Sequence, residues 1–174
     1  IVSPMNPKSA RSITSIAAVG IAKEDLVKFK DVTHNDLRSG GWDPIERLKD
    51  QDIDGVSAEV LYATYAMNLY NMPNAELQEA SFNAYNEWLC EMCNAAPDRL
   101  VGLSLISMYD VDHAVKELER WTKRGLRGAM IACEPPEGTE YSGKLYEPFW
   151  AKAEEMQVPI SIHTLTSNRK PSYR

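Results

Sequence analysis

Four short apolar runs alternate with amphipathic helical segments along this chain, and this alternation constrains its fold more than any other feature. The runs cover about residues 56–62, 100–107, 128–132 and 158–163. Each run is apolar throughout rather than at every second position, which is typical of parallel strands buried on both faces. A unit length of about thirty residues in the later part of the chain predicts an α/β fold, either a (β/α)8 barrel or a doubly wound sheet.

Cap residues set the predicted limits of the helices. Asp-Pro-Ile-Glu at residues 43–46 has the chemistry of a helix start and predicts a short helix to about Asp50. Asn74 and Asp110 are suited to cap two longer helices, and Gly125 ends the second of them. The side chains expected to face the core are Leu77, Ala80, Ala84, Tyr85, Trp88, Leu89 and Met92 in the first long helix, Val111, Ala114, Val115, Leu118 and Trp121 in the second, and Leu145, Phe149, Trp150, Ala153 and Met156 in the third.

The composition argues against several classes of protein. A hydrophobic content of 44% with 25% charged residues is ordinary for a chain that buries a core. A formal net charge of -6 offers no broad positive surface to a nucleic acid, and no apolar run approaches the roughly 18 residues of a membrane span. Three cysteines make no disulfide framework, which agrees with a reducing compartment. We therefore expect a cytoplasmic protein.

The C-terminal ends of the predicted strands identify the candidate site, because parallel α/β folds bind their ligands there. His163 ends the last run, where an imidazole could be a metal ligand, a general base or a hydrogen-bonded core residue. Tyr62, Tyr109 and Cys133 follow or end the other runs and, with Arg169, are candidate substrate-binding residues. A thiol nucleophile needs a base that spacing does not identify, so Cys133 is expected to line a pocket.

Five segments, in order between about Gly40 and His163, share the pattern of one known family. They are GGWDPIERLKDQDIDGVSAEVLY, AYNEW, PDRLVGLSLI, GLRGAMI and YEPFWAKAEEMQVPISIH. With these segments the chain resembles the amidohydrolase-related family of metal-dependent hydrolases and decarboxylases. The branch that it resembles includes aminocarboxymuconate-semialdehyde decarboxylase and the resorcylate decarboxylases.

This resemblance implies a (β/α)8 barrel with one divalent metal at its mouth, zinc in the first place and manganese as the alternative. The family's P-[IV]-x-I-H pattern matches Pro159 to His163, which implies that His163 is a metal ligand. Residues 42–174 would form a portion of a single barrel domain with the family's strands two to five, and residues 1–41 a mostly irregular lead-in. The family's H-x-H pair and its later His and Asp have no match, and the chain begins at Ile1 rather than Met. We therefore expect a piece of a longer enzyme.

Other candidate groups have simpler interpretations. Cys90 and Cys93 form a C-x-x-C near the end of a predicted helix, whereas redox motifs of this kind open a helix, so we expect packing residues. His113 follows a helix cap and is expected to face solvent. His34 lies in a Thr-His-Asn-Asp segment that is typical of a turn.

Two functions remain open on these grounds. The first is a metal-dependent hydrolase or non-oxidative decarboxylase of a small carboxylated or aromatic-derived substrate. The second is a non-catalytic α/β half-barrel that serves assembly or ligand binding, since four unclosed strands leave two edges and an apolar face exposed. Either function favours a homodimer, with no nucleic acid and no membrane among the partners.

Overall fold

The computed structural model describes residues 22, 24, 25, 38–164 and 166. The chain divides into two units, residues 1–50 and 51–174, and each is described by itself. Most of the predicted lead-in, together with His34 and Arg169, lies outside the described residues. The extent of the lead-in and of the barrel portion therefore stays a prediction.

The first described elements are a short 3-10 helix, η4 (Ser39–Gly41), and helix α1 (Pro44–Asp54). Asp43 begins α1 as predicted, because its Oδ1 accepts hydrogen bonds from the backbone N–H groups of Ile45 and Glu46. The helix ends later than the predicted Asp50. It continues to Asp54 and is followed by Gly55, whose φ of 70° is the left-handed conformation that ends many helices.

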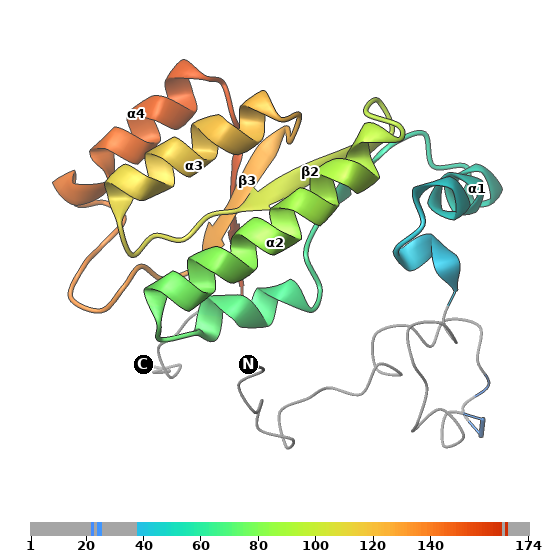
Figure 1. Cartoon of the computed structure of the whole chain (residues 1–174), viewed down its shortest axis with the longest axis horizontal. Coiled ribbons are helices and arrows are strands. Elements are labelled where there is room, and N and C mark those ends of the chain that lie inside the picture. Colours follow the sequence, from blue (N-terminus) through green and yellow to red (C-terminus); the bar gives the residue numbers. More distant parts are fainter. Residues whose placement is uncertain (1–21, 23, 26–37, 165, 167–174) are drawn as a thin grey trace. The chain divides into compact units, whose positions relative to one another are not determined.

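A four-stranded parallel sheet and three long helices form the body of the second unit (Figure 1). The strand order is β1-β2-β3-β4, and every neighbouring pair is parallel, which confirms the predicted α/β class. In chain order the elements are β1 (Glu59–Leu61), η5 (Ala66–Asn71), α2 (Ala75–Asn94), β2 (Leu100–Leu105), α3 (Val111–Lys123), β3 (Gly128–Ala132), η6 (Lys144–Tyr146), α4 (Glu147–Glu155) and β4 (Ile160–His163).

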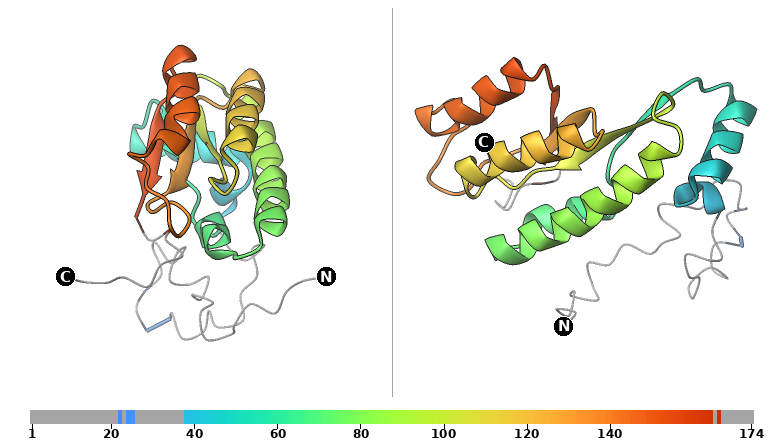
Figure 2. Two further views of the ribbon diagram at one scale, coloured as in Figure 1. Left: turned by 90° about the vertical axis from the view of Figure 1, so that its left-hand side faces the viewer. Right: turned by 45° about the horizontal axis from the view of Figure 1, so that its top comes forward.

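The sheet is part of a barrel rather than of a doubly wound fold. Consecutive strands are spatial neighbours throughout, so right-handed connections place all the crossover helices on the same face. A doubly wound sheet instead reverses its strand order and carries helices on both faces. The sheet curls, with α2, α3 and α4 along its outer side (Figure 2). The four strands are therefore a portion of a (β/α)8 barrel.

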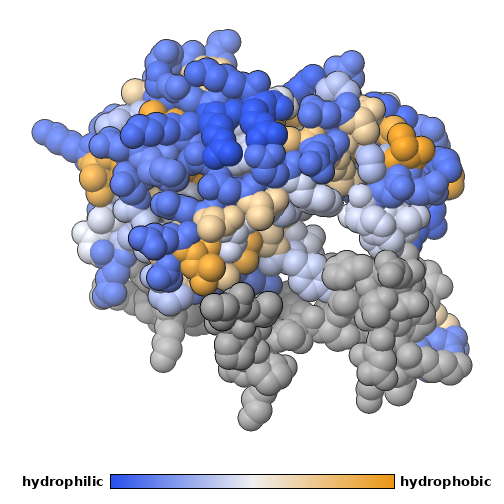
Figure 3. All heavy atoms as spheres, viewed as in Figure 1, coloured by the Kyte–Doolittle hydropathy of each residue, from blue (hydrophilic) through white to orange (hydrophobic). Residues whose placement is uncertain are grey.

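The main packed layer lies between the sheet and the helices. A Cβ on Gly102 of β2 would meet Leu126, Cys93 and Leu89 within about 3 Å, so only glycine permits this close approach of the strand to α2. Trp121 of α3 and Phe149 of α4 are fully buried. Over α3 and α4, the outer surface in Figure 3 is mostly hydrophilic, as expected of amphipathic helices.

The predicted cores of α3 and α4 are largely correct, whereas that of α2 is wrong by part of a turn. Leu77 and Trp88, expected in the core, are 46% and 38% exposed. In their place α2 buries the polar Gln78 and Asn86. Leu145, before α4, is also exposed rather than buried. The prediction failed for α2 because it scored hydrophobicity alone, and these buried amides find backbone partners that a hydropathy pattern does not reveal.

The two edge strands are shorter and more exposed than predicted. The strand expected at residues 56–62 comprises only Glu59–Leu61, and that expected at 158–163 comprises Ile160–His163. Val60 of β1 is 49% exposed and Ile162 of β4 is 56% exposed. Burial on both faces holds for β2 and β3, because the helices cover their outer face and the buried cluster that includes Tyr70 and Met130 covers their inner face. None of the described helices is long and apolar enough to cross a membrane.

Candidate functional site

His163 is the last residue of β4 and lies at the C-terminal edge of the sheet, as predicted. It pairs in register with Ala132, the last residue of β3, and its side chain is half-buried. Because side chains alternate along a strand, Ser161 lies on the same face as His163, whereas Ile162 lies on the other. The strand thus presents a hydroxyl and an imidazole together.

The contact that Tyr62 makes shows which face of the sheet carries Ser161 and His163. The residue directly follows β1, yet its hydroxyl is 2.9 Å from Ser161 Oγ on β4. In a flat sheet β1 and β4 would be three strand spacings apart, roughly 14 Å, which is beyond the reach of one side chain. Tyr62 therefore crosses the concave side of a curled sheet, and its ring centroid lies 6.0 Å from that of His163. We call Tyr62, Ser161 and His163 the inner-face cluster.

The tautomer of His163 follows from its backbone contact. His163 Nδ1 lies 2.5 Å from the carbonyl oxygen of Thr164. A carbonyl oxygen only accepts, so Nδ1 carries the proton and donates it. In the tautomer with the proton on Nδ1 alone, Nε2 carries the lone pair. This is the arrangement of metal-binding histidines, whose second nitrogen is held by a carbonyl or carboxylate.

Thr166 joins the ends of β3 and β4. Its hydroxyl accepts a hydrogen bond from the backbone N–H of Cys133 at 2.9 Å and donates to the carbonyl oxygen of His163 at 2.5 Å. The residue is fully buried. These two bonds fix the backbone that carries His163 against the segment that follows β3.

The other two described candidates, Cys133 and Tyr109, lie in the segments after β3 and β2 and have different surroundings. Cys133 is half-buried, and neighbouring Tyr141 donates its hydroxyl proton to the carbonyl oxygen of Ala132 at 2.9 Å. Burial, together with Tyr146 and Cys133 nearby, raises the pKa of Tyr141, so this phenol stays neutral. Tyr109 donates to the carbonyl oxygen of Met72 at 3.1 Å, which directs its hydroxyl to the segment before α2. Of the predicted residues that the structure describes, Tyr62 and His163 are therefore the two that the fold brings together, with Ser161 as their common neighbour.

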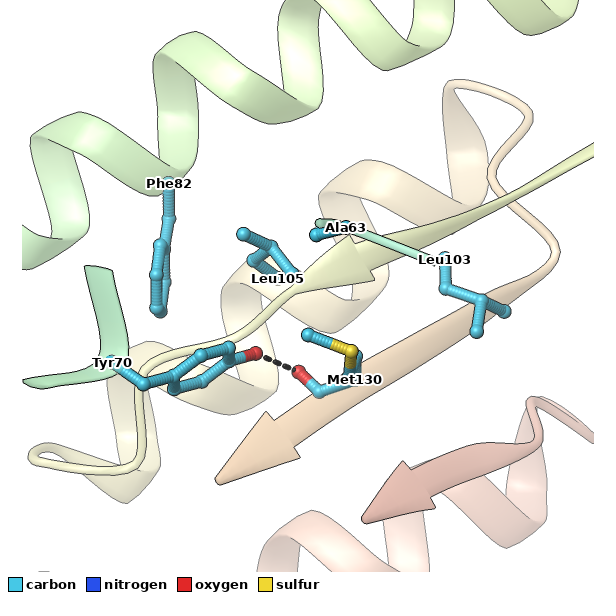
Figure 4. Packing of buried hydrophobic residues seen from close by; sticks show 6 residues of the cluster. All are labelled: Ala63, Tyr70, Phe82, Leu103, Leu105 and Met130. Carbon is cyan, nitrogen blue, oxygen red and sulfur yellow. Dashed lines mark hydrogen bonds between the residues drawn. The ribbon is translucent and has the colours of Figure 1, made fainter. Parts of the chain in front are cut away.

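A buried apolar cluster supports the strands that carry the site (Figure 4). Its members are Ala63, Tyr70, Phe82, Leu103, Leu105 and Met130. Tyr70 of η5 donates a hydrogen bond to the carbonyl oxygen of Met130, and its ring centroid lies 4.6 Å from that of Phe82, with the two rings tilted by 57°. Burial raises the pKa of Tyr70 well above its ordinary value, so it acts here as a neutral donor. The segment after β1 is thereby fastened to β3 and α2.

The sequence reasoning missed three residues that position this site. Ser161 was available from its alternation with His163, and Thr166 from its place just after β4. Asn86, in the AYNEW segment, is fully buried, donates to the carbonyl oxygen of Leu105 at 3.0 Å and accepts from its N–H at 2.8 Å. A polar residue at a core position of a long helix is the signal that could have found it.

The predictions made for the C-x-x-C and for His113 have different outcomes. Cys90 and Cys93 are buried, as expected of packing residues, and burial, with Cys90 close by, raises the pKa of Cys93 to about 11. Such a thiol stays protonated at neutral pH. The prediction that His113 faces solvent holds for part of the ring only: the side chain is 37% exposed, whereas Nε2 is buried and lies 3.5 Å from Glu79 Oε2 of α2.

The described residues do not form a metal site by themselves. Within residues 38–164 and the few others described, no three His, Cys, Asp or Glu side chains are grouped to hold a metal. A catalytic zinc site uses three protein ligands and an open position. His163 provides the chemistry of one such ligand and no more.

Comparisons with known proteins agree with this fold. The family model Amidohydro_2, described as amidohydrolase, matches residues 26–171. A gamma-resorcylate decarboxylase of Rhizobium radiobacter is 28% identical over 123 residues, which are 67% of this chain and 37% of that protein. The chain thus spans well under half the length of this curated relative.

Solved structures give the same result. A 2,6-dihydroxybenzoate decarboxylase in complex with 2,6-dihydroxybenzoate is similar with a TM-score of 0.60 and 28% identity, over 67% of this chain and 38% of that one. A dihydroxybenzoic acid decarboxylase of Polaromonas, with bound manganese and the inhibitor 2-nitroresorcinol, has a TM-score of 0.62 at 20% identity, over 92% of this chain and 46% of that one, and this likeness concerns the fold alone. Because the family model matches most of the length of this chain, the chain belongs to the amidohydrolase family.

Proposed function

We propose that this chain contributes one side of the active site of a metal-dependent, non-oxidative decarboxylase of a small hydroxylated aromatic acid. The observation that carries the proposal is the inner-face cluster, which presents an imidazole held through Nδ1 by a backbone carbonyl, beside a phenol, at the C-terminal edge of a barrel sheet. The relatives that act on resorcylate and dihydroxybenzoate support the class of substrate.

In this proposal each candidate residue has one role, either in binding the metal or in bordering the substrate. His163 Nε2 serves as one ligand of a divalent metal, manganese by analogy with the Polaromonas enzyme or zinc by the resemblance of its sequence. Tyr62 borders the substrate beside that imidazole, and Cys133 and Tyr109 border it from the ends of β3 and β2. Arg169, outside the described residues, is assigned to the substrate carboxylate on charge alone. The remaining metal ligands are not among the described residues, so we assign no chemical step to the metal.

A hydrolase of the same family and a non-catalytic half-barrel are the competing functions. The half-barrel is favoured by one observation, the exposed apolar side chains of Val60 and Ile162 on the two edge strands. In both cases we propose a cytoplasmic protein that forms a homodimer. The free cysteines support this location, because a reducing compartment preserves them.

Titration with Mn²⁺ while the imidazole NMR signals are observed tests the proposal on the chain itself. We expect paramagnetic broadening of the His163 ring protons at lower Mn²⁺ concentration than those of His113, which is also half-buried and serves as the matched control. Addition of 2,6-dihydroxybenzoate should then shift Tyr62 and His163 signals, and His163→Ala should abolish the broadening that Mn²⁺ causes at the neighbouring Tyr62 ring. Equal broadening of both histidines would argue for the non-catalytic half-barrel.

A further inference from the structure

A small cavity between α2 and α3 contains buried polar groups without hydrogen-bond partners. It has a volume of about 10 Å³ and adjoins Leu105, the last residue of β2. Phe82 and Leu105 form its apolar wall, and both are almost fully buried. The polar side of the wall includes Ser107 and His113, which are considered in turn.

Ser107 is the more deeply buried of the two. The residue is 5% exposed, and its Oγ has no hydrogen-bond partner among the described residues. Buried hydroxyls in native proteins are nearly always satisfied, by protein or by ordered water, because an unpaired one costs stability. This oxygen therefore requires a partner in the cavity that it lines.

His113 poses the same requirement from the other side. Its Nε2 is buried and also lacks a hydrogen-bond partner among the described residues. The nearest acceptor, Glu79 Oε2, is 3.5 Å away, which is longer than the roughly 2.7–3.2 Å of an N–H to oxygen hydrogen bond. Nε2 therefore lies beside a carboxylate without a direct hydrogen bond to it.

The remaining polar side chains of the cavity are already engaged. Glu117 Oε2 accepts from Trp121 Nε1 at 2.8 Å, and its Oε1 is 3.3 Å from Arg120 Nη1. Asn83 Oδ1 lies 3.4 Å from the same Arg120 nitrogen. The capacity for new hydrogen bonds therefore belongs to Ser107, His113 and Glu79.

We propose that one ordered water molecule occupies this cavity and bridges Ser107 Oγ, His113 Nε2 and the Glu79 carboxylate. The volume fits a single water, and three partners are the usual number for a buried one. The water accepts the Nε2 proton of His113, donates to Glu79 and exchanges a hydrogen bond with the Ser107 hydroxyl. A metal ion is disfavoured because the described residues hold no group of three suitable ligands.

This water has a structural consequence near the candidate site. Ser107 belongs to the loop after β2, Glu79 to α2 and His113 to the first turn of α3. One molecule therefore ties the loop that leads to Tyr109 to both neighbouring helices. The proposal is independent of any metal at His163.

Water-to-protein cross-relaxation by NMR, on the whole chain, tests the proposal directly. We expect a cross-peak between the water resonance and the ring protons of His113, of the sign that marks a residence time longer than a nanosecond. The absence of this peak would overturn the proposal. A crystal structure in which a cation fills the cavity, or in which Nε2 contacts Glu79 directly at hydrogen-bond distance, would overturn it as well.

The melting temperature of Ser107→Ala gives a second test, whose sign discriminates. If the water is present, the substitution removes one of its partners and lowers the melting temperature by about 2–4 °C. If the cavity is dry, the substitution removes an unsatisfied hydroxyl and raises it. Ser104→Ala is the matched control: Ser104 is also buried, its hydroxyl donates to the carbonyl oxygen of Gly128, and its loss should leave the water cross-peak of His113 unchanged.

Discussion

The two faces of the sheet differ in how they are occupied. On the outer face, side chains such as Trp121 and Phe149 are fully buried under the helices. On the concave face, Tyr62 at the edge is 49% exposed and its hydroxyl pairs with Ser161. Buried apolar area stabilises a fold, whereas a reactive group must remain accessible. The comparison indicates that the outer face is buried under the helices, whereas the inner face is buried at its centre, as at Met130, and is available for function at its edges.

The largest effect that would test this division is expected at Trp121. Trp121→Ala removes a fully buried indole, whose Nε1 also donates to Glu117, and should lower the free energy of unfolding by about 3–5 kcal/mol. Trp88 of α2 is 38% exposed, and Trp88→Ala should lower the free energy of unfolding by less than about 1 kcal/mol. Urea denaturation followed by circular dichroism measures both. Equal losses would break the assignment of stability to the helix-covered layer.

An intermediate effect is expected from alkaline pH on the same layer. Burial raises the pKa of Cys93 from 9.0 to about 11 in the folded chain, with Cys90 as a smaller cause. Because the pKa of this thiol is higher in the folded chain than in the unfolded one, the protonated thiol contributes to the free energy of unfolding. This contribution is fully present below pH 9 and is lost as the pH rises through about 11. The free energy of unfolding should fall over this window, and Cys93→Ala should flatten the fall. A variant with the same pH dependence as the parent would contradict the assignment.

The smallest effect is expected on the inner face. Tyr62→Phe removes a hydroxyl from a half-exposed hydrogen bond and should change the free energy of unfolding by no more than about 1 kcal/mol. A double-mutant cycle with Ser161→Ala measures the coupling of the two hydroxyls. The same variants should shift the NMR signals of the His163 ring, which lies 6.0 Å from the Tyr62 ring. A loss as large as that of Trp121→Ala would place stability on the inner face too.

Local chemistry explains which parts of the fold were predictable. Caps at Asp43, Asn74 and Asp110 act through hydrogen bonds to N–H groups two or three residues away, so the helix starts are confirmed. The β2 and β3 strands are also confirmed, because continuous apolar runs mark strands that are buried on both faces. The face of α2 was wrong because Asn86 is satisfied by Leu105, nineteen residues away, and no local pattern encodes such a pairing.

The amino-acid sequence was sufficient to predict that the chain is an α/β protein, that its strands are parallel, and that His163 ends the last described strand. These features depend on hydrophobic period and on nearby residues. The packing of the whole chain, in contrast, brings the Tyr62 hydroxyl to Ser161, ninety-nine positions away, and buries His113 Nε2 beside Glu79 of α2. The physical reason is that the curl of the sheet and the packing of its helices set such contacts, and both are properties of the whole fold.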